Sequence, residues 1–281
     1  PLYFFYLSIS VVTLLVYGKE YLNSNIVYYV IMLANIPLIL GTQLPVLHHF
    51  WSLAVEEQFY LFWPWIIKRV TRLKFWITGL IFFLFIAKII FWVYYRKSGN
   101  GLPLSAIHIT RFHCMALGAL AAILCKENNK LFMRVSFHIS IQLLVWATLF
   151  ILAFNKFYIA DLINDEVISL ISVFLIVNVS MNPGSLIKLN NRYLSYIGKI
   201  SFGIYVYHPL VIYLTALSTR SILGYLSLEI QYITVFALVI FGTIIIAHLS
   251  YKYFESPFLR LKDRFARIKS SAYESSKKAG F

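Results

Sequence analysis

The chain has 281 residues, of which 60% are hydrophobic and 18% aromatic, while only 13% carry a charge. A water-soluble domain of this length could not cover so much apolar surface, so the composition excludes a soluble globular protein. The net charge of +14 would suit a nucleic-acid partner, but the basic residues are placed in a way that argues against one. Cys114 and Cys125 both lie in an apolar stretch and suggest neither a disulfide framework nor a metal site.

Apolar runs of roughly 20 residues predict an all-α, polytopic transmembrane bundle with about eight or nine membrane segments. Short segments of alternating hydrophobicity, which mark a transmembrane barrel, are absent from the sequence. Residues 26–40 are short and contain Asn35 and Pro37, so they form either a span or an interfacial or re-entrant segment. In chain order, the expected spans are residues 2–17, 26–40, 51–67, 75–95, 112–125, 135–154, 167–181, 200–217 and 230–251.

The basic residues sort among the connections between these spans. Of the 25 Lys and Arg residues, 18 fall in alternate connections and in the C-terminal tail, on one side of the membrane if the helices alternate. The positive-inside rule makes that side cytoplasmic, which predicts an inner-membrane protein with a cytoplasmic C-terminus. The charge therefore indicates topology and contact with anionic lipid rather than a nucleic-acid partner. We expect one membrane domain, 1–262, followed by a basic cytoplasmic tail, 263–281.

Residues 49–64 carry two adjacent carboxylates, Glu56 and Glu57, inside an otherwise apolar run. A charge at membrane depth costs at least about 2.5–3.5 kcal/mol, so such acids usually face a bundle interior, a cavity or a substrate path. On a helix, Ser52, Glu56 and Tyr60 recur at i, i+4 and i+8 and predict one polar stripe. Glu57 points about 100° away from that stripe, so the two acids need not share a role.

Two further polar clusters lie at the fifth and eighth expected spans. Arg111 and His113 stand at the predicted outer mouth of the fifth span, where Arg111 either snorkels to the interface or binds an anion. Ser201, Tyr205 and His208 recur at i, i+4 and i+7 in the eighth span. They form either a structural hydrogen-bonded set or part of a functional site within the membrane.

Four blocks of the sequence resemble, in order, the signatures of acyltransferase family 3, a family of membrane enzymes that O-acylate cell-surface glycans. The resemblance covers essentially the whole chain, and its first block is the most specific. It implies transfer of an acyl group, acetyl most often, from acyl-CoA such as acetyl-CoA to a glycan hydroxyl, with no tightly bound cofactor. The acceptor would be O-antigen, exopolysaccharide or peptidoglycan. The blocks are WSLAVEEQFYLFWP, TRFHCMALGALAA, IGKISFGIYVYHPLVI and YFESPFLRLK.

The resemblance also ranks the candidate site residues. The first acid of the first block is the more constant one in the family, which favours Glu56 over Glu57. Arg111 corresponds to a family arginine, but the family often has Asp two positions later, where this chain has His113. The candidate catalytic residues are Glu56, Glu57, His49 and His208. The candidate residues for binding substrate or donor are Trp51, Ser52, Gln58, Tyr60, Arg111, His113, Ser201 and Tyr205.

Family members usually open with two further helices that carry an Arg and the His regarded as the catalytic base. An Arg-rich turn follows and ends in a pattern like Pro1-Leu2-Tyr3. The resemblance therefore implies a family member without its first two helices, whose 281-residue chain alone would not complete acyl transfer. It implies about ten spans in the complete protein if residues 26–40 do not cross. The residues alone leave a second class open, because intramembrane Glu, His and Arg are also the parts of a proton-coupled transporter or permease.

Overall fold

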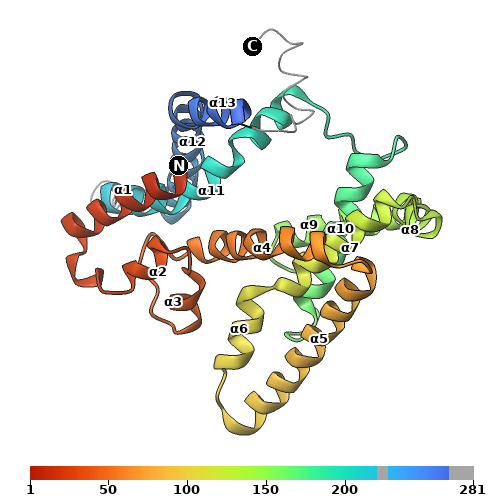
Figure 1. The fold of residues 1–281 in the computed structure, drawn as a ribbon. Helices are drawn as coiled ribbons and strands as arrows, with labels where there is room; N and C mark the ends of the chain where they lie inside the picture. The colour runs from red at the N-terminus through yellow and green to blue at the C-terminus, as the bar shows by residue number, and fades with distance from the viewer. Residues whose placement is uncertain (220–226, 266–281) are drawn as a thin grey trace. The chain divides into compact units, whose positions relative to one another are not determined.

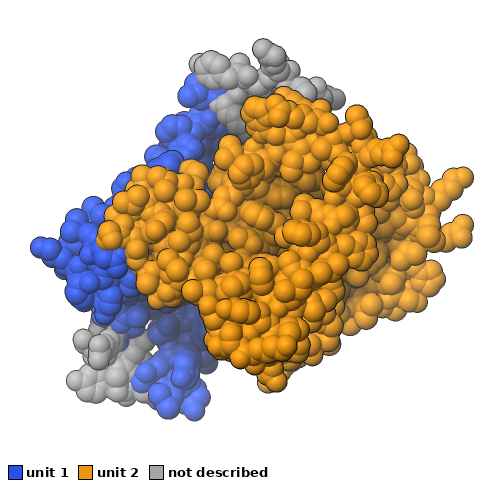
Figure 2. Space-filling model, turned by 60° about the horizontal axis from the view of Figure 1, so that its bottom comes forward, with its two compact units in different colours: residues 1–23, 45–47, 192–281 blue, residues 24–44, 48–191 orange. Residues whose placement is uncertain are grey.

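The computed structural model describes residues 1–219 and 227–265, and every regular element within these ranges is a helix (Figure 1). The expected all-α fold class is therefore confirmed. Most of the expected basic tail, 263–281, lies outside the described residues. The chain forms two compact units, which are coloured separately in Figure 2 and are described here one at a time.

Unit 1 consists of residues 1–23, 45–47 and 192–281. Its helix α11 packs along α12 and also contacts α1. Gly203 suits the close approach of α11 and α12, because a Cβ atom there would make a tight contact of 3.2 Å with the Cβ of Ala247. The helices are α1 (Leu2–Tyr17), α11 (Arg192–Thr219), α12 (Leu228–Ser250) and α13 (Ser256–Phe265), with a 3₁₀ turn at Lys19–Tyr21 and a π-helical turn at Tyr251–Glu255.

Unit 2 consists of residues 24–44 and 48–191. Its helix α7 packs against both α5 and α10, and α10 also contacts α9. Helix α5 is capped at its C-terminus by Gly99, whose positive φ of 73° is a conformation that glycine adopts without steric cost. The helices are α2 (Ile26–Val30), α3 (Asn35–Ile39), α4 (Phe50–Arg69), α5 (Leu73–Ser98), α6 (Leu102–Thr110), α7 (Phe112–Lys126), α8 (Lys130–Phe137), α9 (Ile139–Ala153) and α10 (Asn164–Met181).

Several helices are long and apolar enough to cross a bilayer, which agrees with a membrane protein. Within the described ranges there are five such helices, or six if α8 and α9, which are bent by 57° at their junction, form one span. The estimate of eight or nine segments is therefore not confirmed. Helix α1 is apolar but has only 16 residues, and Glu56, Glu57 and Gln58 lower the hydropathy of α4. The five are Leu73–Ser98, Leu102–Lys126, Asn164–Met181, Arg192–Thr219 and Leu228–Leu261.

Two expected spans differ from the structure in informative ways. Residues 26–40 form two short helices, α2 and α3, and Met32 between them has a positive φ of 58°. Each helix has five residues, too few to cross a bilayer, which favours the non-spanning alternative. The expected span 112–125 begins too late, because the apolar helical segment runs from Leu102 to Lys126 and is interrupted at Arg111.

Candidate active site

A cavity of about 580 Å³ opens in unit 2 among α4, the α6–α7 segment and α10. Helix α4 contributes Trp51, Ser52 and Glu56. Ser52 and Glu56 share this wall because residues four positions apart lie on one face of a helix. The remaining polar lining residues are Arg111, Cys114, Ser169 and Ser172, and the apolar ones include Val55, Ile109, Met115, Val173 and Ile176.

Arg111 occupies a break inside a long apolar segment. It ends α6 and begins α7, and its backbone has a left-handed φ of 49°. A residue with a side chain reaches this conformation only at a cost of order 1–3 kcal/mol, and such strain is concentrated at functional sites. The break also places Arg111 nine residues after Leu102 rather than at the outer mouth of the span, where the sequence had placed it.

The guanidinium of Arg111 is held on two sides. Its Nε donates to the carbonyl of His108 at 3.0 Å, and Nη2 lies 3.2 Å from Oδ1 of Asp165. Its Cζ also lies 5.5 Å from the centre of the Trp51 ring, within the range of a cation–π contact. The side chain is nevertheless 48% exposed. The guanidinium is therefore fixed by neighbouring residues and is still accessible from the cavity that it lines.

Other residues of the first block lie away from this cavity. Glu57 and Tyr60 line a second cavity of about 390 Å³ together with Gln58. The expected stripe of Ser52, Glu56 and Tyr60 is therefore divided. Each step of four residues turns a helix by about 40°, so two steps carry Tyr60 about 80° from Ser52.

Gln58 has a visible structural role, and His49 lies apart from the cavity of Glu56. The Nε2 of Gln58 donates to Oδ1 of Asn35 at 2.8 Å, which ties α4 to α3. His49 is 5% exposed and precedes the first residue of α4. It is not among the described residues that line the cavity of Glu56.

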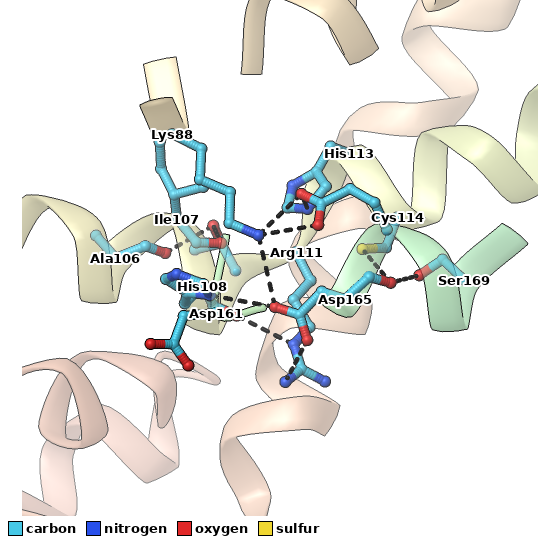
Figure 3. Close-up of polar contacts among 12 residues, drawn as sticks. Lys88, Ala106, Ile107, His108, Arg111, His113, Cys114, Asp161, Asp165 and Ser169 are labelled. Carbon is cyan, nitrogen blue, oxygen red and sulfur yellow. Dashed lines mark hydrogen bonds and ion pairs between the residues drawn. The ribbon is translucent and has the colours of Figure 1, made fainter. Parts of the chain in front are cut away.

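A network of ionisable side chains adjoins the cavity and joins α5, α6, α7 and α10 (Figure 3). At its centre, the fully buried Lys88 of α5 places Nζ 2.8 Å and 3.0 Å from the two carboxylate oxygens of Glu166. The same Nζ lies 3.9 Å from Asp165. Nδ1 of His108 is 3.2 Å from Asp165, and Nε2 of His113 is 3.0 Å from Glu166.

The permanent charges of the network balance one another. Lys88 and Arg111 carry two positive charges, and Asp165 and Glu166 carry two negative charges. Both acids lie in the first turn of α10, where a carboxylate is favoured by the helix dipole. A buried charge is tolerated only when it is paired and hydrogen-bonded, and this pairing explains how Lys88 can be fully buried.

His113 belongs to this network rather than to the cavity of Glu56. Its side chain is buried and contacts Glu166. It also borders a separate, apolar cavity of about 290 Å³, with Phe82, Phe85 and Leu117 among its other lining residues. The structure therefore places His113 two residues from Arg111 but in the wall of a different cavity.

The remaining candidates, Ser201, Tyr205 and His208, lie on α11 in unit 1. Nδ1 of His208 donates to the carbonyl of Tyr205 at 2.7 Å, and their rings lie 5.7 Å apart. Ser201 donates to the carbonyl of Gly198 at 2.9 Å. These contacts favour the structural alternative for the set, since His208 and Ser201 each bond a backbone carbonyl of their own helix.

Sequence reasoning missed four members of the network: Lys88, His108, Asp165 and Glu166. A signal was present for Lys88, which is a single charge inside the apolar run 75–95. The rule that drew attention to Glu56 applies to Lys88 equally, because an intramembrane charge needs a partner. Its partners are 77 and 78 residues away along the chain, so only the tertiary structure identifies them.

The cavity combines the features of a small-molecule site. Its walls combine apolar side chains and the Trp51 ring with a few polar groups that converge from three helical segments. Glu56 supplies a carboxylate that can accept a proton, and Arg111 supplies donors that can bind an oxygen carrying negative charge. This arrangement fits proton removal from a hydroxyl and stabilisation of an oxyanion.

Gly118 offers a direct test of this cavity. It lines the wall, and a Cβ atom added there would meet no atom within 4 Å. Gly118→Leu should fold, because leucine favours a helix by about 1 kcal/mol over glycine. The isobutyl group should displace a substrate, and a misplacement of 1 Å can lower activity about 10²-fold. The measurement is the rate of the acyl transfer that the resemblance implies, at matched protein amounts.

Gly79 provides the matched control for Gly118. It also lies within an apolar helix, it is exposed, and a Cβ atom there meets no atom within 4 Å. Gly79→Leu should retain activity close to that of the unaltered protein. Equal rates for both variants would show that substrate does not use the cavity beside Gly118.

Residues 1–252 match the sequence profile of a protein family described as an acyltransferase domain. The chain is 31% identical to "Putative O-acetyltransferase" of Staphylococcus aureus strain COL over 232 residues, which are 75% of this chain and 36% of that protein. The figures for the protein of the same name from Staphylococcus aureus strain Mu50 are identical. "Putative acetyltransferase" of Acidianus two-tailed virus is 28% identical over 169 residues, 58% of this chain and 48% of that protein.

The chain thus spans little more than a third of the length of the staphylococcal relatives, 36%. No solved structure matches it.

Proposed function

The chain belongs to acyltransferase family 3, whose domain its residues 1–252 match, and from this premise we propose that it moves an acyl group from acyl-CoA to a hydroxyl of a cell-surface glycan. The family membership makes the protein an acyltransferase rather than the proton-coupled transporter that the intramembrane charges also allowed. The observation that supports the proposed site is the cavity that brings Glu56, Ser52 and Arg111 together.

The reaction that we propose breaks the thioester C–S bond of acyl-CoA and forms an ester C–O bond to the glycan. The hydroxyl loses a proton as its oxygen attacks the carbonyl carbon, and the leaving thiolate gains a proton to become CoA thiol. A hydroxyl is a poor nucleophile at neutral pH and needs a base. Glu56 serves this step, either as the base itself or by orienting a histidine that is the base.

Arg111 and Trp51 supply two further functions in the same step, stabilisation of negative charge and a binding surface. The exposed part of the Arg111 guanidinium can stabilise the oxyanion that forms on the acyl carbonyl. The Trp51 ring supplies a rigid, flat surface in the cavity wall, and its contact with Arg111 fixes the relative position of the two groups. We propose acetyl as the acyl group, with acetyl-CoA as donor and no tightly bound cofactor.

Deletion of the gene tests this function. The O-acyl content of purified envelope polysaccharide should fall when the gene is deleted and should return when it is restored. NMR and mass spectrometry of the polysaccharide then identify the acyl group and the hydroxyl that carries it. Unchanged O-acylation of every envelope glycan in the deletion strain would contradict the proposed acceptor class.

We also propose that the protein lies in the inner membrane with a cytoplasmic C-terminus. The connection around Arg69 then faces the cytoplasm, and the connection around Asn100 faces outward. In a variant without Cys114 and Cys125, a cysteine at Arg69 should resist an impermeant thiol reagent in intact cells. A cysteine at Asn100 should react. Labelling at Arg69 with protection at Asn100 would contradict the proposed orientation. Ser275, a third labelling position, lies outside the described residues.

A further inference from the structure

We propose that Lys88 is a positioning residue for acyl transfer, which acts by keeping the guanidinium of Arg111 available to the substrate. The inference rests on the proposed function of the cavity that contains Arg111. Lys88 itself lies outside that cavity, and it touches the two carboxylates of the network instead.

The geometry provides a short physical link between the two cations. Lys88 contacts Asp165 at 3.9 Å, and the other oxygen of Asp165 contacts Arg111 at 3.2 Å. Lys88 also neutralises Glu166, the residue next to Asp165, through two contacts of 2.8 Å and 3.0 Å. Figure 3 shows the Lys88 ammonium directed toward Asp165, with Arg111 on the far side of Asp165.

Charge balance explains why this link controls Arg111. With Lys88 present, each of the two adjacent carboxylates has one permanent cation nearby. Without Lys88, Arg111, which contacts Asp165, would be the one permanent cation left among the described residues of the network. Attraction in a site of low dielectric constant is strong, so the guanidinium should shift toward the acids and away from the cavity.

The two histidines of the network face the same acids and enter this balance. His108 of α6 contacts Asp165, and His113 of α7 contacts Glu166. Both histidines therefore remain beside the acids when Lys88 is removed, and Arg111 is the group of this network that also borders the cavity.

A purely structural role is the competing explanation, because Lys88 also ties α5 to α10. Lys74 offers a matched control. It belongs to the same helix and forms an ion pair of 2.6 Å with Glu127, which directly follows α7. That pair is about half exposed, at 47% and 48%, so Lys74→Met should leave acyl transfer unchanged.

The test is a double-mutant cycle in membranes that contain the intact protein. Transfer of radiolabelled acetyl from acetyl-CoA to glycan isolated from the deletion strain is measured, with KM for this glycan and kcat determined separately. The variants are Lys88→Met, Arg111→Asn and their combination. Asparagine is chosen because it tolerates the left-handed backbone found at this position.

We expect Arg111→Asn to lower kcat/KM about 10²-fold and Lys88→Met to lower it about tenfold or more. If Lys88 acts through Arg111, the double variant should be within about twofold of Arg111→Asn alone. Multiplicative losses in the double variant would overturn the proposal, because they would show that Lys88 acts independently of Arg111.

A rescue experiment covers the case in which Lys88→Met accumulates poorly. Lys88→Met combined with Glu166→Gln removes one charge of each sign and leaves Arg111 paired with Asp165. Recovery of most of the activity supports control through charge balance, whereas no recovery in a folded protein refutes it. A complete absence of transfer by the unaltered protein would instead reject the proposed function.

Discussion

Glu56→Gln should abolish acyl transfer while the protein still inserts into the membrane and accumulates. The substitution keeps the size of the side chain but removes the negative charge and the ability to accept a proton. Loss of a positioned acid or base lowers a rate by about 10²–10⁴-fold. The O-acyl content of envelope polysaccharide, measured by NMR in a complemented deletion strain, should therefore match that of the strain without the gene.

Glu57→Gln is the natural control for this experiment. The two acids are adjacent on α4, have the same chemistry and are both exposed, but Glu57 lines a different cavity with Tyr60. The Glu57 variant should keep most of its activity. Near-normal O-acylation with Glu56→Gln would remove Glu56 from the mechanism, and equal losses in both variants would indicate a general effect of α4.

Glu166→Ala should destabilise the protein more than any exposed substitution. It removes the carboxylate that contacts the fully buried Lys88 at 2.8 Å and 3.0 Å, and leaves Asp165 at 3.9 Å. Breaking a buried ion pair on one side costs about 3–5 kcal/mol. The midpoint of thermal unfolding in detergent should consequently fall by roughly 10 °C.

Glu127→Ala supplies the comparison, because it breaks the exposed ion pair with Lys74. An exposed pair contributes about 0–1 kcal/mol, so its loss should move the midpoint very little. Similar midpoints for the Glu166 and Glu127 variants would mean that the buried network does not stabilise unit 2.

Local periodicity was enough to predict part of the candidate site. The spacing of Ser52 and Glu56 placed both on one face of a helix, and they share a cavity wall in the structure. The prediction was less accurate over a longer stretch, because the drift of 3.6 residues per turn carries Tyr60 to another face. The number of spans was harder to predict, since the acids in α4 reduce its hydropathy.

Other features depend on long-range contacts that no local pattern contains. The break at Arg111 has a left-handed backbone at a residue other than glycine. Because no glycine marks this position, the sequence contains no local signal of the break. The pairing of Lys88 with Asp165 and Glu166 joins helices far apart in the chain. His113 was grouped with Arg111 by sequence, but the structure directs it to Glu166.

The most direct test uses purified full-length protein in proteoliposomes, supplied with acetyl-CoA carrying a labelled acetyl group and with glycan isolated from the deletion strain. Alkali-labile label should appear on the glycan with the unaltered protein and should be reduced to background with Glu56→Gln. Label transferred equally by both proteins would contradict the assignment of the cavity of Glu56 as the site of acyl transfer.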